Sequence, residues 1–153
     1  MKTLVLGLGN PILGDDGVGI YTVRAVRERL KGRVGVDIKE ASLGGLRLME
    51  EILGYDRVII VDAIITGRGA VGEIYRFSPQ NLKGTLHLSS PHDLNFTTAL
   101  ELGRIYAPDD VPKEIVIYAI EVAENLTFAE ELSGKVKTAG LKTAEMITNE
   151  LNE

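Results

Sequence analysis

The 153-residue chain contains no cysteine, and this absence excludes several kinds of chemistry. Without thiolates the chain can form no disulfide, use no cysteine nucleophile and bind neither zinc nor an iron–sulfur cluster through sulfur. Basic residues are also in the minority, because 22 Asp and Glu outnumber 17 Lys and Arg and give a net charge of −5. No basic stripe is present to neutralise phosphates, so nucleic acid is disfavoured as a partner.

Signals for export or membrane insertion are missing as well. Met1 to Thr3 lead directly into a strand-like segment, without the basic start, apolar stretch and cleavage site of a signal peptide. No apolar run is long enough to cross a bilayer. We therefore expect a cytoplasmic protein with no membrane partner. The length favours a single domain over residues 1–153.

Alternating strand-like and helix-like segments predict an α/β fold. Strands are expected at residues 3–6, 34–40, 57–62, 70–77 and 114–120, and helices at residues 18–31, 46–53, 94–106 and 130–151. The uninterrupted apolar run at residues 58–61 is typical of a central strand covered on both faces, whereas the alternation at residues 34–39 favours an edge. Residues 70–77 follow the previous strand too closely for a helical crossover, which predicts antiparallel pairing. The expected architecture is a three-layer α/β/α sandwich with a mainly parallel, mixed five-stranded sheet.

The most informative feature that is present is a glycine-rich turn, GLGNPILGDDG, at residues 7–17. It lies between the first strand and the first helix, which is the layout of a phosphate-binding loop. The Lys and Ser or Thr that such a loop needs are replaced by Asp15 and Asp16, whose carboxylates would repel a triphosphate and attract a cation. Ile12 stands where a dinucleotide-binding motif needs glycine. Asp15 has an alternative role as the cap of the following helix, but one cap suffices and leaves Asp16 unexplained.

Two further polar residues are expected at the same edge of the sheet as Asp16. Asp62 ends the apolar run of the third strand, and His92 precedes the third helix. Ligands collect beyond the carboxyl ends of strands in open α/β sheets, so these side chains could form an oxygen-rich divalent metal site with open positions. The alternatives are that Asp62 caps the next turn and His92 is an ordinary loop histidine. His87 alternates with apolar neighbours, which favours a structural role over a ligand role.

Three motifs in this order resemble the [NiFe]-hydrogenase maturation protease family. GLGN at residues 7–10 is followed by an acidic residue before GVG at residues 17–19. An apolar strand ends in Asp-Ala at residues 62–63, and SPH at residues 90–92 opens a helix. The resemblance extends over nearly the whole chain.

The resemblance implies an endopeptidase that removes a C-terminal extension from a hydrogenase large-subunit precursor once nickel has been inserted. It also implies that Asp16, Asp62 and His92 are the metal ligands and the catalytic site. The nickel would then be borne by the substrate and bound only weakly when free. The first ligand is often Glu in the family, so the shorter Asp16 implies a tighter site or a closer backbone. Glu40 stands where many members have an Asp followed by Gly-Gly-Thr, but the Thr is lost, which disfavours a catalytic role for Glu40.

The sequence restricts the mechanism mainly by exclusion. It contains no H-E-x-x-H zinc motif, and no nucleophile-elbow signature surrounds the serines before His92. We expect water activated near the nickel to attack the peptide bond, with a carboxylate as base. Two alternatives stay open: a metal-free peptidase of the same fold acting on another protein, and a metal-sensing or chaperone-like binding module that holds the precursor without cutting it.

Overall fold

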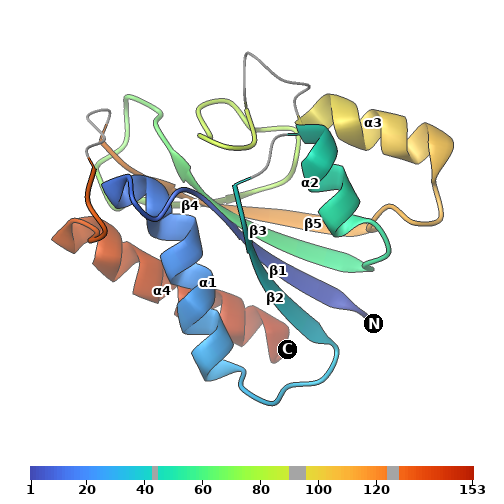
Figure 1. The fold of residues 1–153 in the computed structure, drawn as a ribbon, viewed down its shortest axis with the longest axis horizontal. Coiled ribbons are helices and arrows are strands. Elements are labelled where there is room, and N and C mark those ends of the chain that lie inside the picture. Colours follow the sequence, from blue (N-terminus) through green and yellow to red (C-terminus); the bar gives the residue numbers. More distant parts are fainter. Residues whose placement is uncertain (43–44, 90–95, 124–127) are drawn as a thin grey trace.

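The structure is a computed structural model and describes residues 1–42, 45–89, 96–123 and 128–153. The strands are β1 (Thr3–Leu8), β2 (Val36–Ala41), β3 (Arg57–Ile64), β4 (Ile74–Phe77) and β5 (Glu114–Glu121). The helices are α1 (Val18–Arg29), α2 (Gly45–Ile52), α3 (Phe96–Tyr106) and α4 (Gly134–Leu151), and a short 3-10 helix, η1 (Gly14–Gly17), precedes α1. The strands form one five-stranded sheet in the order β2-β1-β3-β5-β4 (Figure 1).

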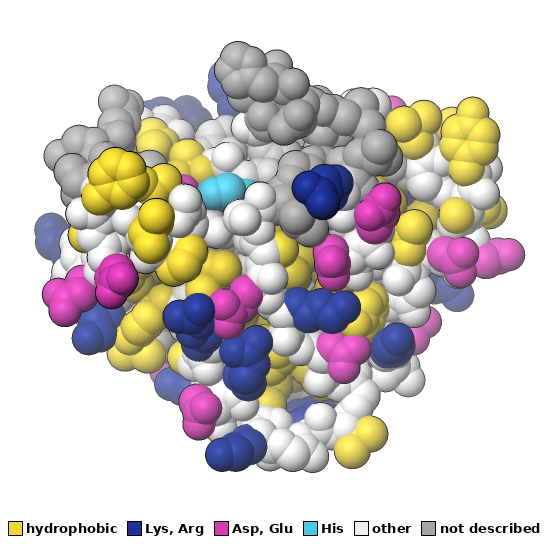
Figure 2. Space-filling model, viewed as in Figure 1, with side chains coloured by type: hydrophobic (Ala, Val, Ile, Leu, Met, Phe, Trp, Pro, Cys, Tyr) yellow, Lys and Arg dark blue, Asp and Glu magenta, His cyan; other side chains and the backbone are white. Residues whose placement is uncertain are grey.

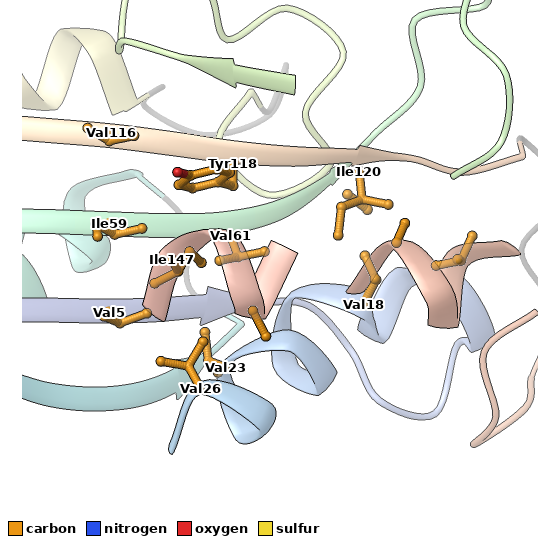
Figure 3. Packing of buried hydrophobic residues seen from close by; sticks show 14 of the residues in the cluster. Val5, Val18, Val23, Val26, Ile59, Val61, Val116, Tyr118, Ile120 and Ile147 are labelled. Carbon is orange, nitrogen blue, oxygen red and sulfur yellow. The ribbon is translucent and has the colours of Figure 1, made fainter. Parts of the chain in front are cut away.

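Helices cover both faces of this sheet and make three layers. α1 and α4 pack on one face, and α2 and α3 pack on the other (Figure 1). Successive strand residues point to opposite faces, so Val5 and Ile59 join the core beneath α1 and α4, whereas Leu6 and Ile60 join the core beneath α2 and α3. Figure 3 shows the first of these cores, with Val5 and Ile59 on neighbouring strands. The apolar runs in β1 and β3 are therefore continuous because both faces are buried, and the expected α/β/α architecture is confirmed.

The strand directions also agree with the sequence analysis. β1 pairs in parallel with β2 and β3, β3 pairs in parallel with β5, and β4 pairs antiparallel with β5. β2 lies at one edge of the sheet, as its alternating pattern predicts. Of the helices within the described ranges, none combines the length and hydrophobicity needed to cross a bilayer.

Several expected element boundaries were wrong. The strand expected at residues 70–77 begins only at Ile74, because the preceding residues form a loop that Glu121 holds through side-chain hydrogen bonds. The last helix begins at Gly134 and not at residue 130, with Ser133 as its N-cap. The first helix ends at Arg29, two residues early, and Gly32 then takes a positive φ of 82° that helical residues do not adopt.

The start of α1 lies unusually close to the sheet. A Cβ built on Gly19 would lie 2.3 Å from the carbonyl oxygen of Leu8 and 2.5 Å from that of Val61. A Cβ on Gly7 would in turn lie 2.4 Å from the carbonyl oxygen of Gly19. Only glycine allows this approach of helix backbone to strand backbone. The approach places η1, and with it Asp16, over the carboxyl ends of β1 and β3.

Candidate active site

Asp16 is fixed by the glycine-rich turn in which it lies. Its Oδ2 accepts a hydrogen bond from the Asn10 backbone N–H at 2.8 Å, and the residue is only 4% exposed. Gly9 packs against it so closely that a Cβ there would lie 2.3 Å from the Asp16 carbonyl oxygen. The GLGN motif therefore does not cradle a phosphate. Its glycine admits the turn that carries Asp16, and its asparagine N–H orients the carboxylate.

Asp62 lies near the end of β3 and is completely buried. Its Oδ1 accepts a hydrogen bond from the Ala63 N–H at 2.9 Å, and its Oδ2 accepts bonds from the N–H groups of His87 at 2.9 Å and Leu88 at 3.2 Å. Burial raises the pKa of the Asp62 carboxyl above its ordinary value, while the hydrogen bonds and charge of His87 oppose that rise. Backbone donors thus compensate a carboxylate that would otherwise be costly to bury.

His87 lies between the two carboxylates. Its Nδ1 is 2.7 Å from Asp62 Oδ1, and its Nε2 is 3.3 Å from Asp16 Oδ2. The two ring nitrogens can donate hydrogen bonds at the same time only in the imidazolium form. Burial by itself lowers the pKa of His87, but hydrogen bonds to Asp16 and Asp62 outweigh it and raise the pKa to about 10. In the imidazolium form, the ring is a cation between two carboxylates. The His87 side chain is 18% exposed, and Figure 2 shows a histidine side chain (cyan) at the molecular surface.

A short stretch after β4 brings His87 to this position by pairing with the end of β3. The Leu86 N–H donates to the Ala63 carbonyl at 3.0 Å, and Thr85 forms an isolated antiparallel bridge with Ile64. Sequence reasoning expected His87 to be structural and missed its contact with both carboxylates. The sequence pattern that could have indicated this contact is weak. The alternation at residues 85–88 predicts that the imidazole points away from Leu86 and Leu88, but it does not predict which residues the ring contacts.

The structure brings together two of the three residues expected to bind metal. Asp16 and Asp62 meet at one edge of the sheet through His87, whereas His92 lies outside the described residues. Among the residues that the structure describes, no group of three His, Asp or Glu side chains is arranged to hold a metal ion. The assignment of Asp16, Asp62 and His92 as ligands stays a prediction.

Asp15 has a different role from its neighbour. It was expected to cap the helix that follows, but Gly17 is the N-cap of α1, with no side-chain bond there. Asp15 instead accepts hydrogen bonds from the backbone N–H of Ser133 at 2.7 Å and from its hydroxyl at 2.8 Å. Ser133 is the N-cap of α4. Asp15 therefore joins the glycine-rich turn to the start of the last helix.

Two glutamates near strand ends are held by other side chains. Glu121, buried at the end of β5, accepts hydrogen bonds from the Thr66 N–H at 2.8 Å, from the Thr66 hydroxyl, and from the Tyr75 hydroxyl at 2.9 Å. It thereby holds the loop between β3 and β4, a role that the sequence analysis did not assign. Glu40 pairs with Arg24 at 2.9 Å and Arg27 at 3.1 Å, and the hydrogen bond from Arg24 chiefly lowers its pKa. That pairing ties β2 to α1.

Comparison with known proteins identifies the family of this chain. The family profile described as hydrogenase maturation protease matches residues 20–150. The chain belongs to the hydrogenase maturation protease family. Its sequence is 27% identical over 121 residues to hydrogenase 2 maturation protease from Escherichia coli, which corresponds to 78% of this chain and 73% of that protein.

Solved structures of the family extend the match to the whole fold. The hydrogenase maturating endopeptidase HybD from Escherichia coli superposes with a TM-score of 0.80 at 27% identity, covering 99% of this chain and 93% of that chain. A hydrogenase maturation protease from Thermococcus kodakarensis gives a TM-score of 0.72 at 27% identity, with all of both chains covered. These findings confirm the family expected from the motifs, the α/β fold and the assignment of the chain as a peptidase.

Proposed function

We propose that this family member is an endopeptidase that removes the C-terminal extension from a nickel-loaded [NiFe]-hydrogenase large-subunit precursor. It recognises the bound nickel through Asp16, Asp62 and His92. The observation that carries this proposal is the meeting of Asp16 and Asp62 at the carboxyl ends of β1 and β3, where the glycine-rich turn fixes one carboxylate and backbone donors fix the other. The relatives named for hydrogenase maturation support the choice of substrate.

The chemistry of the site suits a metal that arrives with the substrate. Carboxylate and imidazole donors from only three residues leave several positions of an octahedral nickel shell to other ligands. In the precursor those ligands come from the large subunit, so the protease supplies only the remaining ligands of the nickel. Water close to the metal is more acidic than bulk water, and a carboxylate of the site accepts its proton as it attacks the peptide bond. The nickel is thus part of the substrate and not a resident cofactor.

The test is to incubate the protein separately with nickel-loaded and nickel-free large-subunit precursor and to weigh the products. Loss of a C-terminal peptide from the loaded form alone supports the proposal. Equal cleavage of the nickel-free form supports the alternative of a metal-independent peptidase. A stable complex with no change of mass would instead make the chain a chaperone-like binding module for the precursor.

A further inference from the structure

The hydrogen bonds around Asp62 leave its oxygens little capacity to bind a metal. Oδ1 accepts bonds from the Ala63 N–H and the His87 ring, and Oδ2 accepts bonds from the N–H groups of His87 and Leu88. A carboxylate offers about four lone-pair positions in all, so each oxygen already carries two donors. Of these donors, only the His87 imidazole belongs to a side chain. It is the one that can leave without a movement of the backbone.

The same ring also contacts Asp16, through one of its two carboxylate oxygens. Its Oδ2 accepts a backbone hydrogen bond from Asn10 at 2.8 Å and also lies 3.3 Å from His87 Nε2. Rotation of the imidazole away from the site would free a position on Asp16 and another on Asp62 at once. The backbone bond from the His87 N–H to Asp62 would remain, so the segment that carries the ring would stay attached to β3.

We propose that His87 is a positioning residue that holds Asp16 and Asp62 together in the free enzyme and must be displaced before the two carboxylates can bind one metal ion together. The inference rests on the proposed function, because it takes both carboxylates to be ligands of the substrate's nickel. It adds a basis for selectivity. A free ion must displace the imidazole with its own binding energy, whereas nickel inside a docked precursor has the further binding energy of the protein–protein contact.

The inference predicts that removal of the imidazole strengthens the binding of free metal. Nickel titration calorimetry should show His87→Ala binding free Ni²⁺ at least about tenfold more tightly than wild type, comparable with the loss of one charge-assisted hydrogen bond. In His87→Asn the amide replaces Nδ1 toward Asp62 but is too short to reach Asp16, so its affinity should lie between the two. Adding Asp16→Asn to His87→Ala should abolish the gain. Unchanged affinity in His87→Ala would overturn the inference, and weaker binding would make His87 a ligand itself.

A spectroscopic measurement on the wild type covers the case in which the variants fail to fold. Nitrogen NMR of the protein with ¹⁵N-labelled histidine should show the His87 ring signals moving toward those of a free imidazole when Zn²⁺ is added. A shift to the positions of a metal-bound imidazole would refute the inference, and so would binding of Zn²⁺ that leaves the ring signals unchanged.

A cleavage assay separates this inference from the proposed function. Free Zn²⁺ should inhibit cleavage of loaded precursor by His87→Ala at a concentration at least about tenfold lower than it inhibits the wild type, in line with the affinity gain. If the wild-type enzyme cleaves loaded precursor and this shift is absent, the role of His87 fails while the function stands. If the wild type cleaves no precursor, the proposed function fails whatever His87 does to metal affinity.

Discussion

At the scale of single residues, two adjacent aspartates face different parts of the molecule. The Asp15 carboxylate bonds to Ser133 at the start of α4, whereas that of Asp16 bonds to Asn10 and His87 over the strand ends. Asp15 is half-buried and lies among solvent-accessible partners, while Asp16 is nearly inaccessible. Their substitutions should therefore be separable by experiment.

We expect Asp16→Asn to abolish precursor cleavage and to leave the fold intact. The amide oxygen can still accept the Asn10 hydrogen bond, but the charge that would bind nickel is lost. Asp15→Asn should retain most activity and lose roughly 1 kcal/mol of stability, the usual worth of an accessible hydrogen bond. Product mass and thermal melting measure the two effects. Equal loss of activity in both variants would mean that the roles assigned to the two carboxylates are wrong.

Asp62 carries a second prediction, which concerns stability. Asp62→Ala would leave the buried N–H groups of Ala63, His87 and Leu88 without their acceptor and would remove the partner of the imidazolium. We expect a loss of about 3–5 kcal/mol in the free energy of unfolding, the range for breaking a buried ion pair. Urea denaturation measures it. Asp62→Asn keeps one acceptor oxygen and should lose less; a loss as large as that of Asp62→Ala would refute this account.

The sequence predicted the carboxylates of the site better than its histidine. Asp16 comes after β1 and Asp62 lies near the end of β3, two strands that were recognisable from their apolar runs, and parallel strands end at the same edge of a sheet. His87 lies in a segment without regular secondary structure, and its position depends on the bridge between Thr85 and Ile64. Such a tertiary contact leaves no periodic trace in the sequence.

At the scale of elements, the packing of α1 against the sheet depends on Gly19. Gly19→Ala would place a methyl group 2.3 Å from the Leu8 carbonyl oxygen and 2.5 Å from that of Val61, atoms that cannot move without distorting two strands. We expect a loss of at least about 2 kcal/mol in the free energy of unfolding, within the range for overpacking, measured by urea denaturation. The added methyl group should push α1 away from the sheet. Because α1 continues from η1, this shift should also move Asp16 and lower the rate of precursor cleavage.

Gly134 provides the matched control. It begins α4, and a Cβ there would meet nothing within 4 Å. Gly134→Ala should therefore be neutral or stabilising by up to about 1 kcal/mol, through the lower entropy of the unfolded chain. If both glycine variants lose similar stability, the loss at Gly19 does not come from the close approach of α1 to the sheet, and this explanation is wrong.

Element boundaries were harder to predict than element types. Residues 70–73 look like part of a strand, yet Glu73 and Tyr75 join the hydrogen-bond network of Glu121, and Gly72 takes a positive φ of 92°. That network connects segments more than forty residues apart, as the Tyr75–Glu121 contact shows with a separation of 46. Local propensity cannot register such a contact, so the strand was predicted too long.

At the scale of the whole molecule, one carboxylate attaches the last helix to the sheet. Glu150 of α4 accepts hydrogen bonds from Arg57 of β3 at 2.6 Å, Arg76 of β4 at 3.0 Å and Tyr118 of β5 at 2.5 Å. Burial alone would raise the pKa of Glu150, but hydrogen bonds from Arg76 and Tyr118 and the charges of both arginines outweigh it and lower the pKa. Glu150 thus connects α4 to three strands while it is ionised.

This lowered pKa predicts how stability depends on pH. A carboxyl group with a lower pKa in the folded state than in the unfolded state stabilises the fold above its unfolded pKa, and the contribution is lost as the pH falls through the folded pKa. We therefore expect Glu150→Gln to be less stable than wild type at pH 7. The difference in stability between the two proteins should shrink from about pH 4.5 downward, since 4.5 is the ordinary pKa of Glu.

Glu145→Gln is the control for this prediction. The pairing of Glu145 with Lys142 at 3.9 Å is exposed, so its loss should change the free energy of unfolding by no more than about 0.5 kcal/mol at every pH. Thermal melts of the three proteins from pH 7 to pH 3 measure both differences, and a Glu150→Gln deficit that stays constant across this range would contradict the ionised role of Glu150.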